Sequence, residues 1–517
     1  MASNLPDYVA SATPSPNRIP WYKSTAQTYA GIMLWFVFWL KVAQAGDAPG
    51  GALTQGLQPA FIGLIGAALF CYALFYLAPA MFGLKSRFPL YIVGTSTYGV
   101  QGGFLMPGFL MGILQFGWLG VNAYFSAMLL AAPFNQGPGS PLHLALGAIW
   151  AIAAAFMGLK GIQYVARVAT YFPIIPLAVL LVLTATSIGG LGDFDQARYT
   201  EAAIARAKDK TQADKAAAVK KATESLEQVR ADEKLADREK QIANAQANLE
   251  AAEKMNETVA TPLSSEWAVI ATLMTVIIGF FATAGAAGVD FGMSNRDGHD
   301  VQWGGLVGIT GATIFAGGLA LLIVAGANGK GIMLGESSPT ALMSGLVGET
   351  TGNVFMYLLA VAAFPPACFS AFIAANSFKT TLPKVNPFIS VGVGTAVSIA
   401  LVVTGWAGQA GDVFSIIGAS FGPICGAMAA DYLLSKKQWA GPRAGFNLAG
   451  WISWAVGFVV GAADMAAKYI PALKEFEGYI PVPPLAAMIV GFVLYLLLAM
   501  IGLQSRTLEK PAAAPLA

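Results

Sequence analysis

The sequence of 517 residues is poor in the side chains that build catalytic and metal sites, with only two histidines and three cysteines. His143 and His299 lie far apart in the chain, and Cys71, Cys368 and Cys425 all fall inside apolar stretches. This placement favours packing over disulfide or metal bonding for the cysteines. Because no catalytic constellation can be built from these residues, we expect no enzyme, and we expect no metal or cofactor.

Charge is scarce as well, since only 11% of the residues are charged while 56% are hydrophobic. This composition is typical of a membrane protein rather than a soluble globular protein. The formal net charge of +2 is too small to indicate a nucleic-acid partner. The charge is also unevenly placed: 26 of the 58 Lys, Arg, Asp and Glu residues lie between Gly192 and Ser265, so the rest of the chain is more apolar still.

Twelve apolar stretches are long enough to cross the roughly 30 Å hydrocarbon core of a bilayer. They cover residues 25–46, 58–82, 103–132, 142–158, 163–189, 267–289, 303–326, 353–377, 386–406, 411–434, 447–467 and 483–503. Most basic residues outside the charged insert fall in loops on one side, which places both tails, 1–23 and 504–517, in the cytoplasm. The first 20 residues contain no apolar segment, so no cleavable signal peptide is expected. The sequence predicts an all-α, multi-pass protein of the inner or plasma membrane.

Residues 190–265 have a different composition from the rest of the chain. From 199 to 261 there is no Gly or Pro, and the residues are mainly Ala, Lys, Glu and Gln, which predicts solvated helix. Because the chain must re-enter the membrane on the side it left, we expect an extracytoplasmic helical hairpin with its bend near 225–232. Apolar residues recur every seven positions and predict a thin coiled-coil seam, at Leu235, Ile242 and Leu249. Two interpretations stay open: an arm for a protein partner or self-association, or a tolerated surface insertion.

A lysine, Lys41, interrupts the first apolar stretch between Leu40 and Val42. A charge within a membrane span costs several kcal/mol and usually faces protein or a water-filled cavity. The residues after Lys41 still have helical character, so the lysine lies about a turn and a half from the end of the helix. Its amine either reaches the headgroups along its own side chain or belongs to a binding site.

Three other spans contain residues that suit a site for a planar solute. Trp118 and Asn122 are four residues apart, so an indole face and an amide lie on one side of the third span. Three glycines between Gly279 and Gly288 permit an unwound segment in the sixth span, a feature that transporters use to bind substrate. Pro365 and Pro366 remove two backbone donors from the eighth span and should distort it. Close helix packing through small residues is the alternative for the tryptophan pair and for the glycines.

Together these runs are similar to sequences of the nucleobase–cation symporter family, which includes cytosine, purine and hydantoin permeases. The runs that carry the resemblance are Leu34–Phe36, Tyr98–Gly102 leading to Gly117–Gly120, Asp290, and Phe421–Tyr432. The resemblance covers the twelve spans in order and leaves out the insert. It implies a leucine-transporter-like fold, in which residues 24–189 and 266–434 form an inverted repeat of five plus five helices. Two more helices follow in residues 435–503.

The resemblance also implies a substrate site between helices one, three, six and eight. Trp118 matches the family's stacking tryptophan, and Asn122 takes the place of its polar partner. Phe281 falls where a second aromatic residue encloses the ring in the hydantoin permease, and Lys41 falls at a substrate-contacting glutamine. The substrate-binding residues expected on this basis are Lys41, Trp118, Asn122, Phe281, Gly285 and Ser370.

The eighth span departs from the sodium-coupled members of the family. Phe364 and Pro365 occupy the positions of their ion-binding hydroxyls, and Pro366 and Ser370 those of their asparagines. Sodium needs oxygen ligands, which Phe and Pro side chains lack. We therefore expect a secondary transporter for a small planar nucleobase-like or anionic solute, independent of sodium, with Lys41 as the candidate proton-coupling group. The alternative is a transporter-like sensor whose outer hairpin docks a partner.

Overall fold

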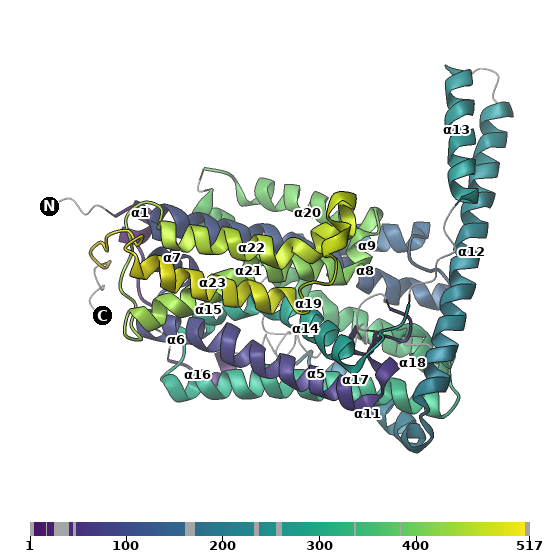
Figure 1. Cartoon of the computed structure of the whole chain (residues 1–517), viewed down its shortest axis with the longest axis horizontal. Helices are drawn as coiled ribbons and strands as arrows, with labels where there is room; N and C mark the ends of the chain where they lie inside the picture. Colours follow the sequence, from purple (N-terminus) through teal and green to yellow (C-terminus); the bar gives the residue numbers. More distant parts are fainter. Residues whose placement is uncertain are drawn as a thin grey trace.

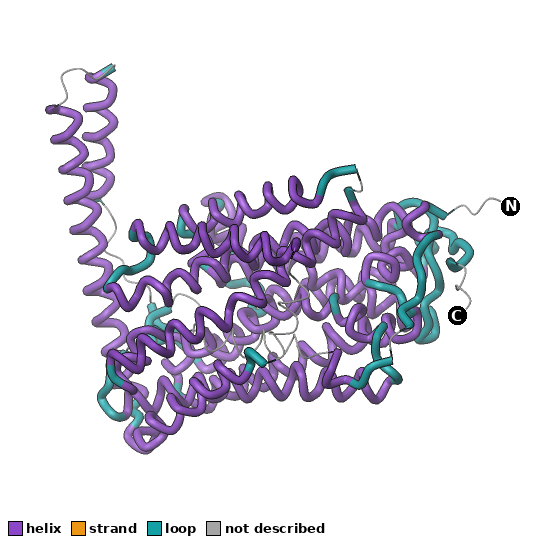
Figure 2. The backbone as a smooth tube through the Cα atoms, turned by 180° about the vertical axis from the view of Figure 1, so that it is seen from behind, coloured by secondary structure: helices purple, strands orange, loops and turns teal. Residues whose placement is uncertain are grey.

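The computed structural model describes residues 5–16, 18–24, 41–44, 48–160, 171–231, 237–254, 261–335, 338–382 and 384–511. The described chain is a bundle of long helices that run beside one another, with a two-helix arm at one end (Figure 1). Both chain termini lie at the other end, as the view from behind also shows (Figure 2). We call these the arm end and the terminal end.

Ten helical stretches of the described chain are long and apolar enough to cross a membrane. In chain order they are formed by α5 (Leu57–Phe70), η2 (Cys71–Tyr76) and α6 (Leu77–Ser86); α7 (Leu90–Gly103), η3 (Phe104–Phe109) and α8 (Leu110–Ala131); α9 (Pro141–Lys160); α11 (Ile174–Ser187) with η5 (Ile188–Asp193); α14 (Glu266–Ala286); α16 (Gly298–Gly305), η6 (Leu306–Gly311) and α17 (Ala312–Gly329); α19 (Glu349–Thr381); α21 (Ala410–Leu434); α22 (Leu448–Tyr469); and α23 (Pro483–Met500). The multi-pass, all-helical class expected from the sequence is therefore confirmed.

Two of the twelve expected spans, the first and the ninth, are not among these ten. The ten are therefore the second to eighth and the tenth to twelfth of the expected spans. The span expected at 386–406 is the shorter apolar helix α20 (Pro387–Val403). The first span, expected at 25–46, lies outside the described residues except for α4 (Lys41–Gln44). The total of twelve spans and the inverted repeat stay predictions.

The helix α21 is the most deeply buried of the spans. Gly418, Gly422 and Gly426 lie four residues apart on its face toward α23, and a Cβ at any of them would come within 2.8 Å or less of Pro484 or Met488. Small residues at this spacing let two helix backbones approach closely in a membrane. The tenth span therefore packs against the last span without side chains between them.

The third span begins at Leu90, earlier than the expected residue 103. It bends at Gly99, where φ is 83° and a Cβ would come within 2.2 Å of the Gly445 carbonyl oxygen. At the bend, the Val100 N–H donates to the Arg443 carbonyl at 2.8 Å and the Gln101 N–H to the Gly445 carbonyl at 3.0 Å. A distant loop thus satisfies the backbone donors that the bend frees, so the glycine-rich run lies inside the span.

The glycines of the sixth span serve close packing rather than unwinding. The helix α14 continues through Gly279 and Gly285, and its only interruption before α15 (Gly288–Gly292) is at Ala287. A Cβ on Gly279 would lie 2.7 Å from the Phe414 carbonyl oxygen, and one on Gly285 would lie 2.8 Å from the Phe75 Cβ. The unwound segment expected between Gly279 and Gly288 is therefore confined to one residue near the end of the span.

The eighth span is likewise continuous. The helix α19 extends without a break through Pro365 and Pro366. The two prolines cannot donate to the carbonyls of Val361 and Ala362, so two helical hydrogen bonds are missing at this point. The expected distortion is thus limited to lost bonds and does not end the helix.

The insert is a helical hairpin, as expected, formed by α12 (Gln196–Ala231) and α13 (Arg238–Glu253). The first helix ends at Ala231, within the range 225–232 expected for the bend, and residues 232–236, with Leu235 of the expected seam, lie outside the described residues. Ala245 is buried, and Ile242 and Leu249 are partly buried, which fits a thin seam between the two helices. The arm lies across the end of the bundle instead of continuing the direction of the bundle helices (Figures 1 and 2). A role of the arm in partner docking or self-association stays a prediction.

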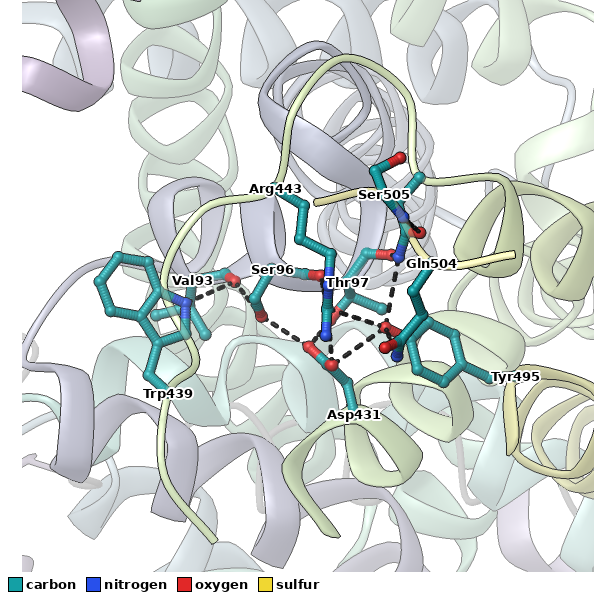
Figure 3. A network of polar contacts seen from close by, with 10 residues as sticks. Val93, Ser96, Thr97, Asp431, Trp439, Arg443, Tyr495, Gln504 and Ser505 are labelled. Carbon is teal, nitrogen blue, oxygen red and sulfur yellow. Dashed lines mark hydrogen bonds and ion pairs between the residues drawn. The ribbon is translucent and has the colours of Figure 1, made fainter. Parts of the chain in front are cut away.

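At the terminal end, a buried polar network surrounds Asp431 of α21 (Figure 3). Asp431 Oδ1 accepts from Arg443 Nη1 at 2.8 Å and from the Tyr495 hydroxyl at 2.9 Å. Asp431 Oδ2 accepts from Ser96 Oγ at 2.6 Å and Thr97 Oγ1 at 3.2 Å. Arg443 is 5% exposed and also donates to the Ser96 carbonyl. The network joins α7, α21, α23 and the loop that carries Arg443.

A second contact near the terminal end joins the sixth span to the third. Asp290 lies in the short helix α15, between the spans Glu266–Ala286 and Gly298–Gly329. Its Oδ1 accepts a hydrogen bond from the Leu90 N–H, at the start of α7, at 2.9 Å. Burial raises the pKa of Asp290 to about 6, and the Leu90 N–H opposes this rise in part.

We expect Asp290→Asn to remove a pH dependence of stability. The folded pKa of Asp290 exceeds its unfolded value of about 4, so the folded state binds this proton more tightly. The stability that the proton contributes is complete below about pH 4 and is lost as the pH rises through about 6. Melting temperatures of both proteins in detergent check this: the value for the native chain should fall relative to that of the variant between pH 4 and 6. Parallel pH profiles would contradict it.

Candidate functional site

Trp118 lies in a cluster of three aromatic side chains from three different spans. Its ring stacks on Phe414 of α21, with centroids 5.2 Å apart and planes 29° apart. Phe280 of α14 meets the Trp118 ring edge-on at 5.1 Å and also contacts Phe414 at 5.8 Å. Trp118 and Phe280 remain partly exposed, whereas Phe414 is buried. Such convergent aromatic faces suit the binding of a planar ring.

The aromatic residue that the sixth span contributes to this cluster is Phe280 rather than Phe281. Neighbouring residues of an α-helix point about 100° apart, so only one of the two can face Trp118. Phe281 is 2% exposed and makes no ring contact with another described aromatic residue. Gly285, one turn further along, packs against Phe75 of η2. The structure therefore does not bring Phe281 and Gly285 together with Trp118.

Asn122 connects three spans through its amide. Its Oδ1 accepts from Trp150 Nε1 of α9 at 3.0 Å and from Ser126 Oγ at 3.3 Å. Its Nδ2 donates to the Ala363 carbonyl of α19 at 3.2 Å. Within the described part of the chain, these bonds use one of the two amide hydrogens, which leaves the other for a solute. Asn122 thus holds the third, fourth and eighth spans together beside the aromatic cluster.

Ser370 of α19 lies at the level of Trp118 along the bundle. The third and eighth spans are antiparallel here, since Asn122 contacts Ala363 whereas Gly112 packs against Phe378. Ser370 falls between these two levels, as Trp118 does. The Ser370 side chain is partly exposed, and no partner for its hydroxyl occurs among the described residues. Its role in binding a solute stays a prediction.

The remaining expected site residue is Lys41. Its backbone begins α4, and its side chain lies outside the described part of the structure. Phe364, at an expected ion-binding position, meets Trp150 edge-on at 5.1 Å and so packs beside Asn122. Sequence reasoning missed Phe280 and Phe414. The signal for Phe280 was its place next to Phe281, whereas nothing in the sequence singled out Phe414.

No protein-family model and no curated protein sequence matches the chain. Among solved structures, it is similar to the inward-facing conformation of Mhp1, with a TM-score of 0.62 and 14% identity over 100% of both chains. It is also similar to Mhp1, a nucleobase-cation-symport-1 family transporter, in a closed conformation with bromovinylhydantoin bound. That alignment has a TM-score of 0.55 and 14% identity over 96% of both chains. The chain therefore has the fold of this transporter.

Proposed function

We propose that this chain, which has the fold of Mhp1, is a secondary transporter for a small planar solute. The observation that carries the proposal is the meeting of Trp118, Phe280 and Phe414 from the third, sixth and tenth spans. Transporters with this kind of fold bind substrate between spans near the middle of the membrane and alternate the access to that site. An aromatic cluster at such a place serves binding as well as packing.

The polar groups beside the cluster favour a nucleobase-like or anionic ring. The free amide hydrogen of Asn122 and the hydroxyl of Ser370 can bond the edge of a ring that stacks on Trp118. The hydantoin bound to Mhp1 is a ring of this class. We infer that Lys41 adds a cation to the site and selects solutes with a carboxylate or an acidic ring nitrogen.

We further infer that the terminal end faces the cytoplasm of a cell whose inner or plasma membrane holds the protein. The loops at this end carry most of the basic residues outside the arm, among them Lys85, Arg87, Arg296, Lys436 and Lys437. An excess of lysine and arginine marks the cytoplasmic side of a membrane protein. The arm would then lie outside the cell or in the periplasm.

The side chains at the expected ion-binding positions of the eighth span cannot coordinate sodium. Phe364 packs against Trp150, and Pro365 and Pro366 continue the helix, so these three side chains offer no oxygen to an ion. The remaining candidate is Lys41. An amine can take up a proton together with an anionic solute and release it on the other side, and we infer this role for Lys41.

We expect solute uptake into proteoliposomes to be unaffected by a sodium gradient and to be driven by a proton gradient. Lys41→Gln should lose the proton-driven accumulation while it still exchanges internal for external solute. Lys85→Gln, an exposed lysine at the end of α6, is the control and should behave as the native chain. The measurement is uptake of a labelled hydantoin or nucleobase with the sodium and pH gradients imposed separately.

Three outcomes would revise the proposal in different ways. Uptake that requires sodium would contradict the interpretation of the eighth span. A Lys41→Gln variant that keeps proton-driven uptake but changes its preferred solute would restrict Lys41 to selecting anions. Binding without any counterflow of solute would identify a sensor instead of a transporter.

A further inference from the structure

The foot of the arm, residues 196–206 of α12, is bonded to the connection between the first and second spans. Gln196 Nε2 donates to the Thr54 carbonyl at 2.8 Å, and the Tyr199 hydroxyl donates to the Gly50 carbonyl at 2.8 Å. Tyr199 is 1% exposed and Ala203 is also buried, although most side chains of α12 are solvated. The foot is therefore packed into the bundle, unlike the rest of the arm.

The connection at residues 48–56 lies between this foot and the end of the first span. Gly50 and Gly51 both have positive φ, 77° and 57°. A Cβ on Gly50 would lie 3.3 Å from the Tyr199 ring, and a Cβ on Gly51 would lie 2.2 Å from the carbonyl oxygens of Ala43 and Gln44. The positive φ values and these short distances favour glycine at both positions, because a Cβ on Gly51 would overlap the carbonyls of α4 and one on Gly50 would crowd Thr54 and the Tyr199 ring. The turn thus lies between the foot and α4 (Lys41–Gln44) and contacts both.

A second contact joins the foot to the connection after the seventh span. Arg206 Nε donates to the Leu334 carbonyl at 2.5 Å, and a Cβ on Gly335 would lie 2.4 Å from the Ala203 backbone nitrogen. The Gly335 N–H in turn donates to Asn328 Oδ1, near the end of α17, at 2.7 Å. About three turns of α12, residues 196–206, therefore connect the outer ends of the first and seventh spans.

The outer half of the arm differs from the foot. It stands clear of the bundle in both views (Figures 1 and 2). Its composition is that of a solvated helix, and most of its side chains are exposed. The arm can therefore restrain the first span only through the contacts of the foot, and not through the tip.

We propose that Tyr199 and Arg206 are positioning residues of the transport machinery, which hold the end of the first span against the seventh while the tip of the arm has no part in transport. The proposal rests on the proposed transport function. Since Lys41 belongs to α4, the helix that the turn contacts, release of the foot would let this helix move and would loosen the solute site. Removing the tip would leave both contacts unchanged.

The first experiment follows hydrogen exchange of residues 48–56 in detergent, which needs no transport. Tyr199→Phe removes one hydrogen bond and should speed exchange about two- to ten-fold. Tyr199→Ala also removes a buried ring and should speed it by more than about ten-fold. A tip deletion that replaces residues 216–252 by a short Gly/Ser linker keeps the foot and should leave exchange as in the native chain.

The second experiment measures uptake of a labelled hydantoin or nucleobase by the same variants. Tyr199→Ala and Arg206→Ala should raise the KM by a larger factor than they lower the maximal rate, and Tyr199→Phe should lie between them and the native chain. The tip deletion should transport normally. Where Tyr199→Ala does not fold, Tyr199→Phe and Arg206→Gln provide the comparison.

The two proposals fail in distinguishable ways. A native chain that moves no solute overturns the proposed function, while hydrogen exchange still decides the role of the foot. Unchanged exchange at residues 48–56 in Tyr199→Ala, or unchanged KM in a transporting protein, overturns the positioning role. Loss of uptake on deletion of the tip overturns the claim that the tip has no part in transport.

Discussion

Arg443→Met is expected to lower the free energy of unfolding by about 3–5 kcal/mol, the cost of leaving a buried charge without its partner. Arg443 and Asp431 are 5% and 0% exposed, and their side chains are 2.8 Å apart. Without the guanidinium, the Asp431 carboxylate would keep only neutral donors, the hydroxyls of Tyr495, Ser96 and Thr97. Denaturant unfolding in mixed micelles measures the loss.

Two comparisons make this prediction specific to the buried pair. The double variant Asp431→Leu/Arg443→Met should regain much of the lost stability, because it removes both charges together. Lys468→Met breaks the more exposed pair with Asp412, at 3.1 Å, and should cost only about 0–1 kcal/mol. Equal losses for Arg443→Met and Lys468→Met would show that the network contributes no more than a surface ion pair.

Trp118→Ala is expected to weaken solute binding about five- to a hundred-fold, since stacking of a base on an aromatic side chain contributes about 1–3 kcal/mol. The partly exposed ring of Trp118 should form one face of the site, while Phe414 supports it from behind. The solute is whichever nucleobase, hydantoin or small carboxylate raises the melting temperature of the native chain. Titration of that solute into both proteins gives the affinity ratio, and an unchanged affinity would assign Trp118 to packing alone.

Phe280 and Phe281 form a matched pair for the same experiment. Phe280→Ala should weaken binding, because this ring meets Trp118 at 5.1 Å. Phe281→Ala should instead lower the free energy of unfolding by about 3–5 kcal/mol through the cavity that it leaves. The folded fraction of Phe281→Ala should bind solute as the native chain does. The opposite result would restore Phe281 as the residue that encloses the ring.

The helical spans could be predicted from the sequence because a bilayer imposes one strong constraint. Backbone groups without water must bond within the segment, so a long apolar stretch in a membrane is a helix. The spacing of Trp118 and Asn122 was informative for the same reason, since it depends only on the geometry of one helix. In the structure Trp118 contacts α14 and α21, whereas Asn122, one turn further along the same helix, contacts α9 and α19. Ser370, which was expected only from the resemblance, lies at the level of Trp118 along the bundle.

The predictions for the glycines and for the start of the third span failed because they depended on contacts with a second segment. A glycine that unwinds a helix and a glycine that lets another helix approach look the same in a sequence. The contacts of Gly279 with Phe414 and of Gly285 with Phe75 show that these glycines let other helices approach closely. The early start of the third span had the same cause, because the donors freed at Gly99 are satisfied by a loop more than 300 residues away. Neighbouring phenylalanines on one helix could not be separated without knowing which side faces Trp118.

The direction of the arm also determines how the molecule occupies the plane of a membrane. A helix of 36 residues is about 54 Å long, and this one lies across the bundle rather than along it. The molecule is therefore wider above the bilayer than within it, and the extra width is on one flank only. Other membrane proteins can approach the bundle closely from the opposite flank. On the flank of the arm, a protein that extends beyond the bilayer would meet the arm, whereas lipids can still contact the bundle there.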